Sequence, residues 1–356
     1  MLKAGTGDSS AELDKPMVPV DLEQALDPLW LRKALAPISG GSPVIWVGTI
    51  DKLETMAAKV RFEVRFENEP DVTHALCLKA FLSAEKARTG GATAVREAKF
   101  YLEVAPHLTM RLPSANAIID HEANRAILIM EDLIVAGAQF CSAHEPFTID
   151  LAVQSLDQIA RLHSASMLLD SNHWIPIRLA YLATAPHFTA PQLQELMDGS
   201  RGKGMSNRTR DASLLLKGMK VLAQHFASRP MAILHGDCHA GNFYLTADGP
   251  GLTDWQLIQR GNWAQDVAYH IAAVLPVEVA EREERALLDH YLDAIRKHGG
   301  TPPDRETAWD DYRAAQIYGY YHWAITTKVE PEIIDIFVHR LGAGVARHDT
   351  YNLLGL

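Results

Sequence analysis

The first third of the chain alternates apolar and polar residues in short runs. Between Ala57 and Phe66, apolar side chains occupy every second position from Val60 onward. A period of two is typical of a β-strand with one buried face. Similar short runs lie on both sides of it, and the predicted strands cover residues 44–50, 57–66, 73–81, 115–120 and 125–130. We expect these strands to form an antiparallel sheet.

Helical periodicity frames the first strands. Residues 20–35 carry apolar side chains at helical spacing and end at a glycine- and proline-containing cluster, which predicts an N-terminal helix. Residues 93–104 show the same spacing and predict a helix between the third and fourth strands. The charged segment that ends at Asp21 lacks the apolar core of a secretory signal, and we expect it to be a frayed tail.

Beyond residue 133 the pattern changes from strands to helices. The predicted helices cover residues 149–169, 191–197, 212–226, 280–297, 308–327 and 331–346. One short hairpin interrupts them, with strands at 242–245 and 251–255 joined through Asp248-Gly249-Pro250.

This order predicts an α+β chain with two lobes. We expect a tail and helix at 1–42, a small antiparallel-sheet lobe at 43–132 and a larger helical lobe at 133–356. The natural hinge is the segment 130–133, and ligands favour such junctions.

The amino-acid composition does not change the predicted fold, but it argues against several classes of protein and partner. The chain has 356 residues, of which 47% are hydrophobic and 22% charged, values typical of a folded globular protein. Its net charge of −10, without a local basic patch, argues against nucleic acid or an anionic membrane as a partner. The apolar runs are too short to span a membrane. Cys77, Cys141 and Cys238 are far apart and odd in number, which favours a reducing, cytoplasmic location.

The segment that carries chemistry surrounds the short hairpin. Asn242 opens its first strand and Asp254 closes its second, so antiparallel pairing brings an amide oxygen and a carboxylate to the same end. Two such hard oxygen ligands suit magnesium. Asp237 precedes the hairpin, where it could accept a proton from a hydroxyl group that is being phosphorylated.

This segment resembles a known group of enzymes. Residues 235–242, His-Gly-Asp-Cys-His-Ala-Gly-Asn, match the His-Gly-Asp-x-His-x-x-Asn loop of aminoglycoside phosphotransferase-like kinases. The runs Asp254-Trp255-Gln256 and Glu131-Asp132-Leu133 make the chain look closest to the choline-kinase-like and ecdysteroid-kinase-like branches.

The resemblance implies a protein-kinase-like fold that uses ATP and Mg²⁺ to phosphorylate the hydroxyl group of a small molecule. It implies that Asp237 is the catalytic base, that Asn242 and Asp254 are magnesium ligands, and that Asp266 braces the catalytic loop. It also implies a hinge at Glu131 to Leu133 whose backbone receives the adenine; the other possibility is a simple helix-entry turn.

The small lobe contains residues for the phosphates. Lys79 lies in the third predicted strand and Glu97 in the following helix, the order that a kinase of this fold needs. We expect the two side chains to form a partly exposed ion pair. The glycine-rich phosphate loop is missing, because Gly48 is the only glycine between residues 44 and 60. Backbone donors of residues 48–55 would then have to replace it.

Two other functions remain open from the residues. The weak phosphate loop allows a catalytically silent nucleotide-binding protein of the same fold. The alternation of His235, Asp237 and His239 allows a metal-dependent hydrolase, although no typical ligand set is completed elsewhere.

The acceptor stays open as well. An aromatic stripe from Tyr318 to Trp323 fits either an apolar acceptor pocket or the core. The helical insertion at 176–230 is expected to contribute to the acceptor site, and both a cationic and an apolar alcohol are allowed. The sequence carries no signal for a particular oligomeric state.

Overall fold

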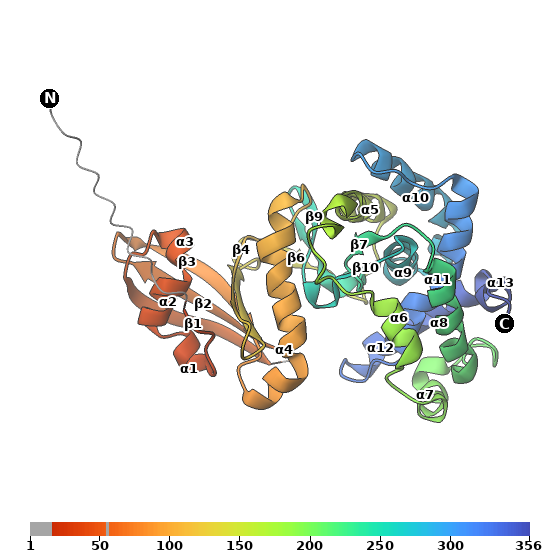
Figure 1. Cartoon of the computed structure of the whole chain (residues 1–356), viewed down its shortest axis with the longest axis horizontal. Helices are drawn as coiled ribbons and strands as arrows, with labels where there is room; N and C mark the ends of the chain where they lie inside the picture. Colours follow the sequence, from red (N-terminus) through yellow and green to blue (C-terminus); the bar gives the residue numbers. More distant parts are fainter. Residues whose placement is uncertain (1–15, 55–56) are drawn as a thin grey trace. The chain divides into compact units, whose positions relative to one another are not determined.

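The computed structural model describes residues 16–54 and 57–356, so the predicted tail lies largely outside the described residues. The chain divides into two compact units (Figure 1). The first ends at Ala98 and also includes Ser114–Asp132. The second comprises Lys99–Pro113 and Leu133–Leu356.

The first unit is built on a five-stranded antiparallel sheet. Its strands are β1 (Val44–Glu54), β2 (Ala58–Phe66), β3 (Glu69–Ala80), β4 (Ala115–Asp120) and β5 (Arg125–Glu131). They pair in the order β1-β2-β3-β5-β4. The predicted antiparallel sheet is therefore confirmed, although β1 ends four residues later and β3 begins four residues earlier than predicted.

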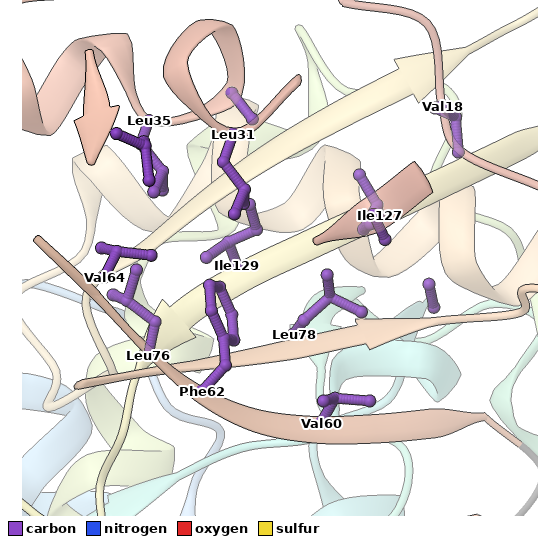
Figure 2. Packing of buried hydrophobic residues seen from close by; sticks show 14 of the residues in the cluster. Val18, Leu31, Leu35, Val60, Phe62, Val64, Leu76, Leu78, Ile127 and Ile129 are labelled. Carbon is purple, nitrogen blue, oxygen red and sulfur yellow. The ribbon is translucent and has the colours of Figure 1, made fainter. Parts of the chain in front are cut away.

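One face of this sheet forms the core of the unit. The alternating residues of β2, from Val60 to Phe66, are buried there. Figure 2 shows Leu31 and Leu35 above the same side chains, and both leucines are fully buried. Alternation in the sequence thus identified the buried face correctly.

The single helix predicted at 20–35 is wrong. The chain forms three short helices instead, α1 (Leu22–Ala25), α2 (Pro28–Ala34) and α3 (Ala36–Ser39). The break has a local cause, because the Asp27 carboxylate accepts hydrogen bonds from the N–H groups of Leu29 and Trp30 and Pro28 follows it. An aspartate cap followed by proline starts a new helix.

Helix α4 (Ala84–Lys99) begins nine residues before its predicted start at residue 93, and a π-helical turn (Phe100–Val104) continues it. Gly90 and Gly91 obscured its first half in the sequence, because glycine is a poor helix former. Both glycines let other groups approach the helix closely, namely the Phe81 ring and the Asn124 carbonyl oxygen.

The second unit is mainly helical. Its longer helices are α5 (Ile149–Ser164), α6 (Arg178–Thr184), α7 (Ala190–Met197), α8 (Ala212–Phe226), α9 (Ala264–Val274), α10 (Val277–Lys297), α11 (Arg305–Ala324) and α12 (Pro331–Arg347), followed by the short α13 (Thr350–Leu353). Helix α9 is buried along its whole length and packs against α11. Within the described part of the chain, no helix is long and apolar enough to cross a membrane.

Two small sheets hold the loops of this unit. Strand β7 (Ala232–Leu234) pairs with β10 (Gln259–Gly261). Strand β8 (Phe243–Thr246) pairs with β6 (Gln139–Phe140) and with β9 (Gly249–Leu252). The α+β organisation with a sheet-rich and a helical lobe is confirmed.

Candidate active site

The loop after β7 is held by a buried carboxylate. Asp266, from the first turn of α9, accepts the backbone N–H groups of His235 at 2.7 Å and of Gly236 at 2.9 Å. It also lies 3.2 Å from the His163 imidazole and is inaccessible to solvent. One side chain thereby fixes two successive peptide groups, a geometry that fits the bracing role implied for Asp266.

His235 is committed to the structure of the loop. Its Nε2 lies 3.0 Å from the Thr253 carbonyl oxygen, and its Nδ1 lies 3.3 Å from the Asp237 N–H group. The ring is fully buried against Trp255.

The backbone conformation between His235 and Asp237 requires a glycine at position 236. Its φ of +83° is a left-handed conformation, and a Cβ atom there would lie 2.4 Å from the Leu257 carbonyl oxygen.

Asp237 is held at both carboxylate oxygens. Tyr269 donates its hydroxyl proton to Oδ1 at 2.9 Å, and the amide nitrogen of Asn242 lies 3.3 Å from Oδ2. The side chain keeps 27% of its surface exposed, so solvent reaches it. Burial would raise the pKa of Asp237, but neighbouring imidazoles, His239 foremost, outweigh this effect and hold the pKa well below its usual range. Asp237 is thus a carboxylate at neutral pH.

Asn242 and Asp254 meet at one end of the β8–β9 hairpin. The ladder pairs Phe243 with Leu252, and the next hydrogen bond runs from Thr253 N–H to the Asn242 carbonyl oxygen at 3.0 Å. Both residues lie just outside the strands, so the prediction that they open and close them is wrong by one residue at Asn242 and two at Asp254. The two residues nevertheless lie at the same end of the hairpin, as the prediction required.

The donor set at this end suits a hard cation. The side-chain nitrogen of Asn242 donates to the Asp237 carbonyl oxygen at 2.8 Å, which leaves Oδ1 as its ligand atom. Asp254 contributes a carboxylate from a left-handed backbone conformation with a φ of +67°. Carboxylate and amide oxygens are the ligands that Mg²⁺ prefers. The residues present therefore fit magnesium, and their role as ligands stays a prediction.

In the first unit, Lys79 of β3 and Glu97 of α4 form the expected ion pair. The Lys79 Nζ lies 2.8 Å from Glu97 Oε2 and 3.0 Å from Oε1. The expectation of a partly exposed pair is wrong, because the two side chains are only 5% and 4% exposed. The sheet and α4 bury both groups, which changes the expected effect of breaking the pair.

In the segment predicted to contact adenine, several backbone groups are already hydrogen-bonded within the protein. The Glu131 N–H donates to the Ser114 carbonyl oxygen at 3.0 Å, and the Asp132 N–H donates to Ala75 at 3.1 Å. The carbonyl oxygen of Leu133 accepts from Ala138 at 2.8 Å. Adenine recognition by Glu131 and Leu133 stays a prediction.

The predicted phosphate-contacting segment is mostly strand. Residues 48–54 belong to β1 and pair with β2, while Thr55 lies outside the described residues. The ring of Trp46 packs where a Gly48 side chain would be.

The family model of the ecdysteroid kinase-like family matches residues 51–300. The chain belongs to the ecdysteroid kinase-like family. The resemblance inferred from the catalytic-loop motif is therefore confirmed. No curated protein sequence matches the chain.

Several solved structures that are similar to this ecdysteroid kinase-like protein are named as small-molecule kinases. An ethanolamine kinase of Plasmodium vivax is 12% identical, with 84% of this chain and 82% of that chain covered and a TM-score of 0.50. A choline/ethanolamine kinase family protein of Mesorhizobium loti is 14% identical, covering 91% and 97% of the two chains, with a TM-score of 0.48. A macrolide 2'-phosphotransferase of Brachybacterium faecium is 16% identical, covering 91% and 98%, with a TM-score of 0.45.

The metallohydrolase alternative finds no support in this ecdysteroid kinase-like chain. Both ring nitrogens of His235 face backbone groups, and Nδ1 of His239 accepts the Gly241 N–H at 3.1 Å. Over residues 16–54 and 57–356, no group of three His, Cys, Asp or Glu side chains could hold a metal ion. The imidazoles are used to shape the loop and to lower the pKa of Asp237.

The aromatic stripe of α11 is mainly core. Tyr318, Tyr320 and Tyr321 are fully buried and Trp323 is 5% exposed. Trp323 nevertheless reaches the candidate site, because its indole N–H donates to the hydroxyl oxygen of Tyr269, which contacts Asp237. Tyr269 was not among the predicted site residues. The signal for Tyr269 was its position, one helical turn after Asp266.

Proposed function

We propose that this ecdysteroid kinase-like chain is an ATP-dependent phosphotransferase that moves the γ-phosphate to a hydroxyl group of a small molecule. The observation that carries the proposal is the loop around Asp237. A solvent-reachable carboxylate is held at both oxygens on a loop braced by Asp266. One of its two donors is Asn242, which shares its end of the hairpin with Asp254. Membership of the family supports the same chemistry.

In the proposed reaction, a bond forms between the acceptor oxygen and the γ-phosphorus, and the bond from that phosphorus to ADP breaks. Asp237 orients the acceptor hydroxyl and receives its proton. Asn242 and Asp254 hold Mg²⁺, which when bound neutralises the charge of the phosphates. Lys79, fixed by Glu97, binds the α- and β-phosphates.

The acceptor is proposed to be a small-molecule alcohol, as the names of the similar solved structures suggest. We propose that the protein works in the cytoplasm without nucleic-acid or membrane partners, since Cys77, Cys141 and Cys238 are free thiols and its charge is negative. A silent nucleotide-binding protein is the second candidate, favoured by the glycine-poor β1.

Two matched carboxylate-to-amide variants test the assigned roles. Asp237→Asn should bind MgATP with nearly unchanged affinity and release ADP about 10² to 10⁴ times more slowly, because only the proton acceptor is lost. Asp254→Asn should instead weaken magnesium-dependent nucleotide binding, and asparagine tolerates the left-handed backbone at this position.

Nucleotide titrations with and without magnesium measure the first quantity, and ADP release over a panel of amino alcohols, sugars, sterols and aminoglycosides measures the second. Equal loss of ATP affinity in both variants would contradict the roles. Nucleotide binding without ADP release on any acceptor would favour the silent protein.

A further inference from the structure

A chain of hydrogen bonds leads from α11 through α9 to the catalytic loop. The Trp323 indole nitrogen lies 2.5 Å from the Tyr269 hydroxyl oxygen, which lies 2.9 Å from Asp237 Oδ1. Tyr269 is fully buried and Trp323 is nearly so. The contacts join residues 86 positions apart along the sequence, so only the packing of α9 against α11 creates them.

The direction of these bonds follows from the chemistry of the groups. An indole N–H can only donate, so the Tyr269 oxygen accepts it. The single hydroxyl proton of Tyr269 is then free to go to the Asp237 carboxylate, which can only accept. Burial and the nearby Asp237 charge raise the pKa of Tyr269 far above its usual value, so the hydroxyl keeps this proton.

The arrangement restrains Asp237 without blocking it. Tyr269 holds Oδ1 while Asn242 holds Oδ2, and the two donors come from different elements. A carboxylate has about four lone-pair sites. Tyr269 and Asn242 use two of them, and His239 Nε2 lies 3.6 Å from Oδ2. One site is then left for an acceptor hydroxyl, and the side chain is 27% exposed.

We propose that Tyr269 is a positioning residue that fixes the Asp237 carboxylate for phosphoryl transfer, and that Trp323 acts through Tyr269 by directing its hydroxyl proton. The inference rests on the proposed phosphotransferase function. It predicts that loss of the Tyr269 hydroxyl slows the chemical step, because a misplacement of about 1 Å can cost on the order of a hundredfold in rate.

The test compares Tyr269→Phe, Trp323→Phe and the double variant, with MgATP as the donor and water or the alcohol panel as the acceptor. Tyr269→Phe should lower kcat for ADP release about tenfold or more while the KM for ATP changes less than twofold. Trp323→Phe should have a smaller effect, and the double variant should be no slower than Tyr269→Phe, since one residue acts through the other. Multiplied effects, or an unchanged kcat in Tyr269→Phe, would overturn the proposal.

Tyr312→Phe is the matched control. It removes another buried tyrosine hydroxyl that contacts a carboxylate, Glu284, away from the loop. It should leave kcat unchanged even if it lowers the unfolding temperature. A loss of kcat equal to that of Tyr269→Phe would show a general packing effect and overturn the positioning role.

A second readout separates this inference from the proposed function. The hydroxyl proton of Tyr269, assigned by its absence in Tyr269→Phe, should exchange slowly with water and exchange faster in Asp237→Ala. Rapid exchange in the unmodified protein would overturn the positioning role even without a known acceptor. Full ADP release by Asp237→Asn would instead overturn the proposed function.

Discussion

At the scale of single residues, the burial of the Lys79–Glu97 pair decides what its loss should do. Glu97→Gln leaves the Lys79 ammonium in a site that is 5% exposed. Removing one partner of a buried ion pair costs about 3–5 kcal/mol, whereas an exposed pair contributes about 1 kcal/mol or less. We expect Glu97→Gln to lower the free energy of unfolding, measured with urea, by the amount for a buried pair, about 3–5 kcal/mol. We expect it to lower the rate of ADP release as well.

The double variant Lys79→Met, Glu97→Gln provides the control for this prediction. It removes both charges, so it should recover much of the stability that Glu97→Gln loses, while ADP release stays low because no cation faces the phosphates. A single variant as stable as the unmodified protein would show that water still reaches the lysine.

The sequence was enough to name candidate site residues, but not to predict what surrounds them. The spacing of Asp237 and Asn242 is local, and the motif preserves it. Tyr269 and Trp323 lie far from this motif in the sequence, and their contact depends on how two helices pack. The burial of Glu97 was misjudged for the same reason, since a partner element covers it.

At the scale of elements, Gly90 in α4 reverses the usual effect of a glycine-to-alanine change. Alanine normally stabilises a helix interior by about 1 kcal/mol relative to glycine. At Gly90 a Cβ atom would lie 2.1 Å from the buried Phe81 ring. Overpacking of this kind costs about 1–3 kcal/mol. We therefore expect Gly90→Ala to lower the denaturant midpoint.

Gly218→Ala in α8 is the matched control. A Cβ atom there would lie 3.1 Å from the end of the Ile317 side chain, which can shift, and at ordinary contact distances of 3.4 and 3.7 Å from Tyr351 and Leu356. Its stability should be unchanged or slightly higher. If Gly90→Ala raised the midpoint as much as Gly218→Ala did, the close contact with Phe81 would not matter.

Elements were predicted incorrectly where the local sequence pattern conflicted with the needs of tertiary packing. Helix α9 is buried on all sides, so it has no polar face and no amphipathic period to find. Helix α4 was hidden by glycines that serve its packing. Strand β2 was predicted well because one of its faces is buried and the other is more exposed, which produces a clear alternation.

At the scale of the whole molecule, the division into a sheet-rich and a helical part could be predicted because the order of strands and helices along the chain already separates them. The identity of the acceptor could not. No motif in the sequence marks the residues that would bind it.

Buried histidines predict how the whole fold responds to acid. Burial lowers the pKa of His270 from 6.5 to about 4. The nearby His235 lowers this pKa further, whereas the Asp266 carboxylate raises it and offsets part of the shift. Burial lowers the pKa of His322 to about 4 as well. The unfolded chain therefore binds protons at these positions before the folded chain does. Their contribution to stability is complete above pH 6.5 and is lost as the pH falls toward 4.

For the fully buried His270, a difference of this size corresponds to a loss of up to about 3 kcal/mol. Buried carboxylates such as Asp266 and Glu284 have pKa values lowered from 3.8 and 4.5, so their contribution is lost only as the pH falls through these ordinary values, and most of it is still present at pH 4.5. Urea unfolding at pH 7 and pH 4.5 measures the effect. His270→Asn should be less stable at pH 7, because its hydrogen bonds at Ser155 and Cys238 are altered, but should lose less stability between the two pH values. An equal pH dependence in both proteins would show that other groups take up the protons.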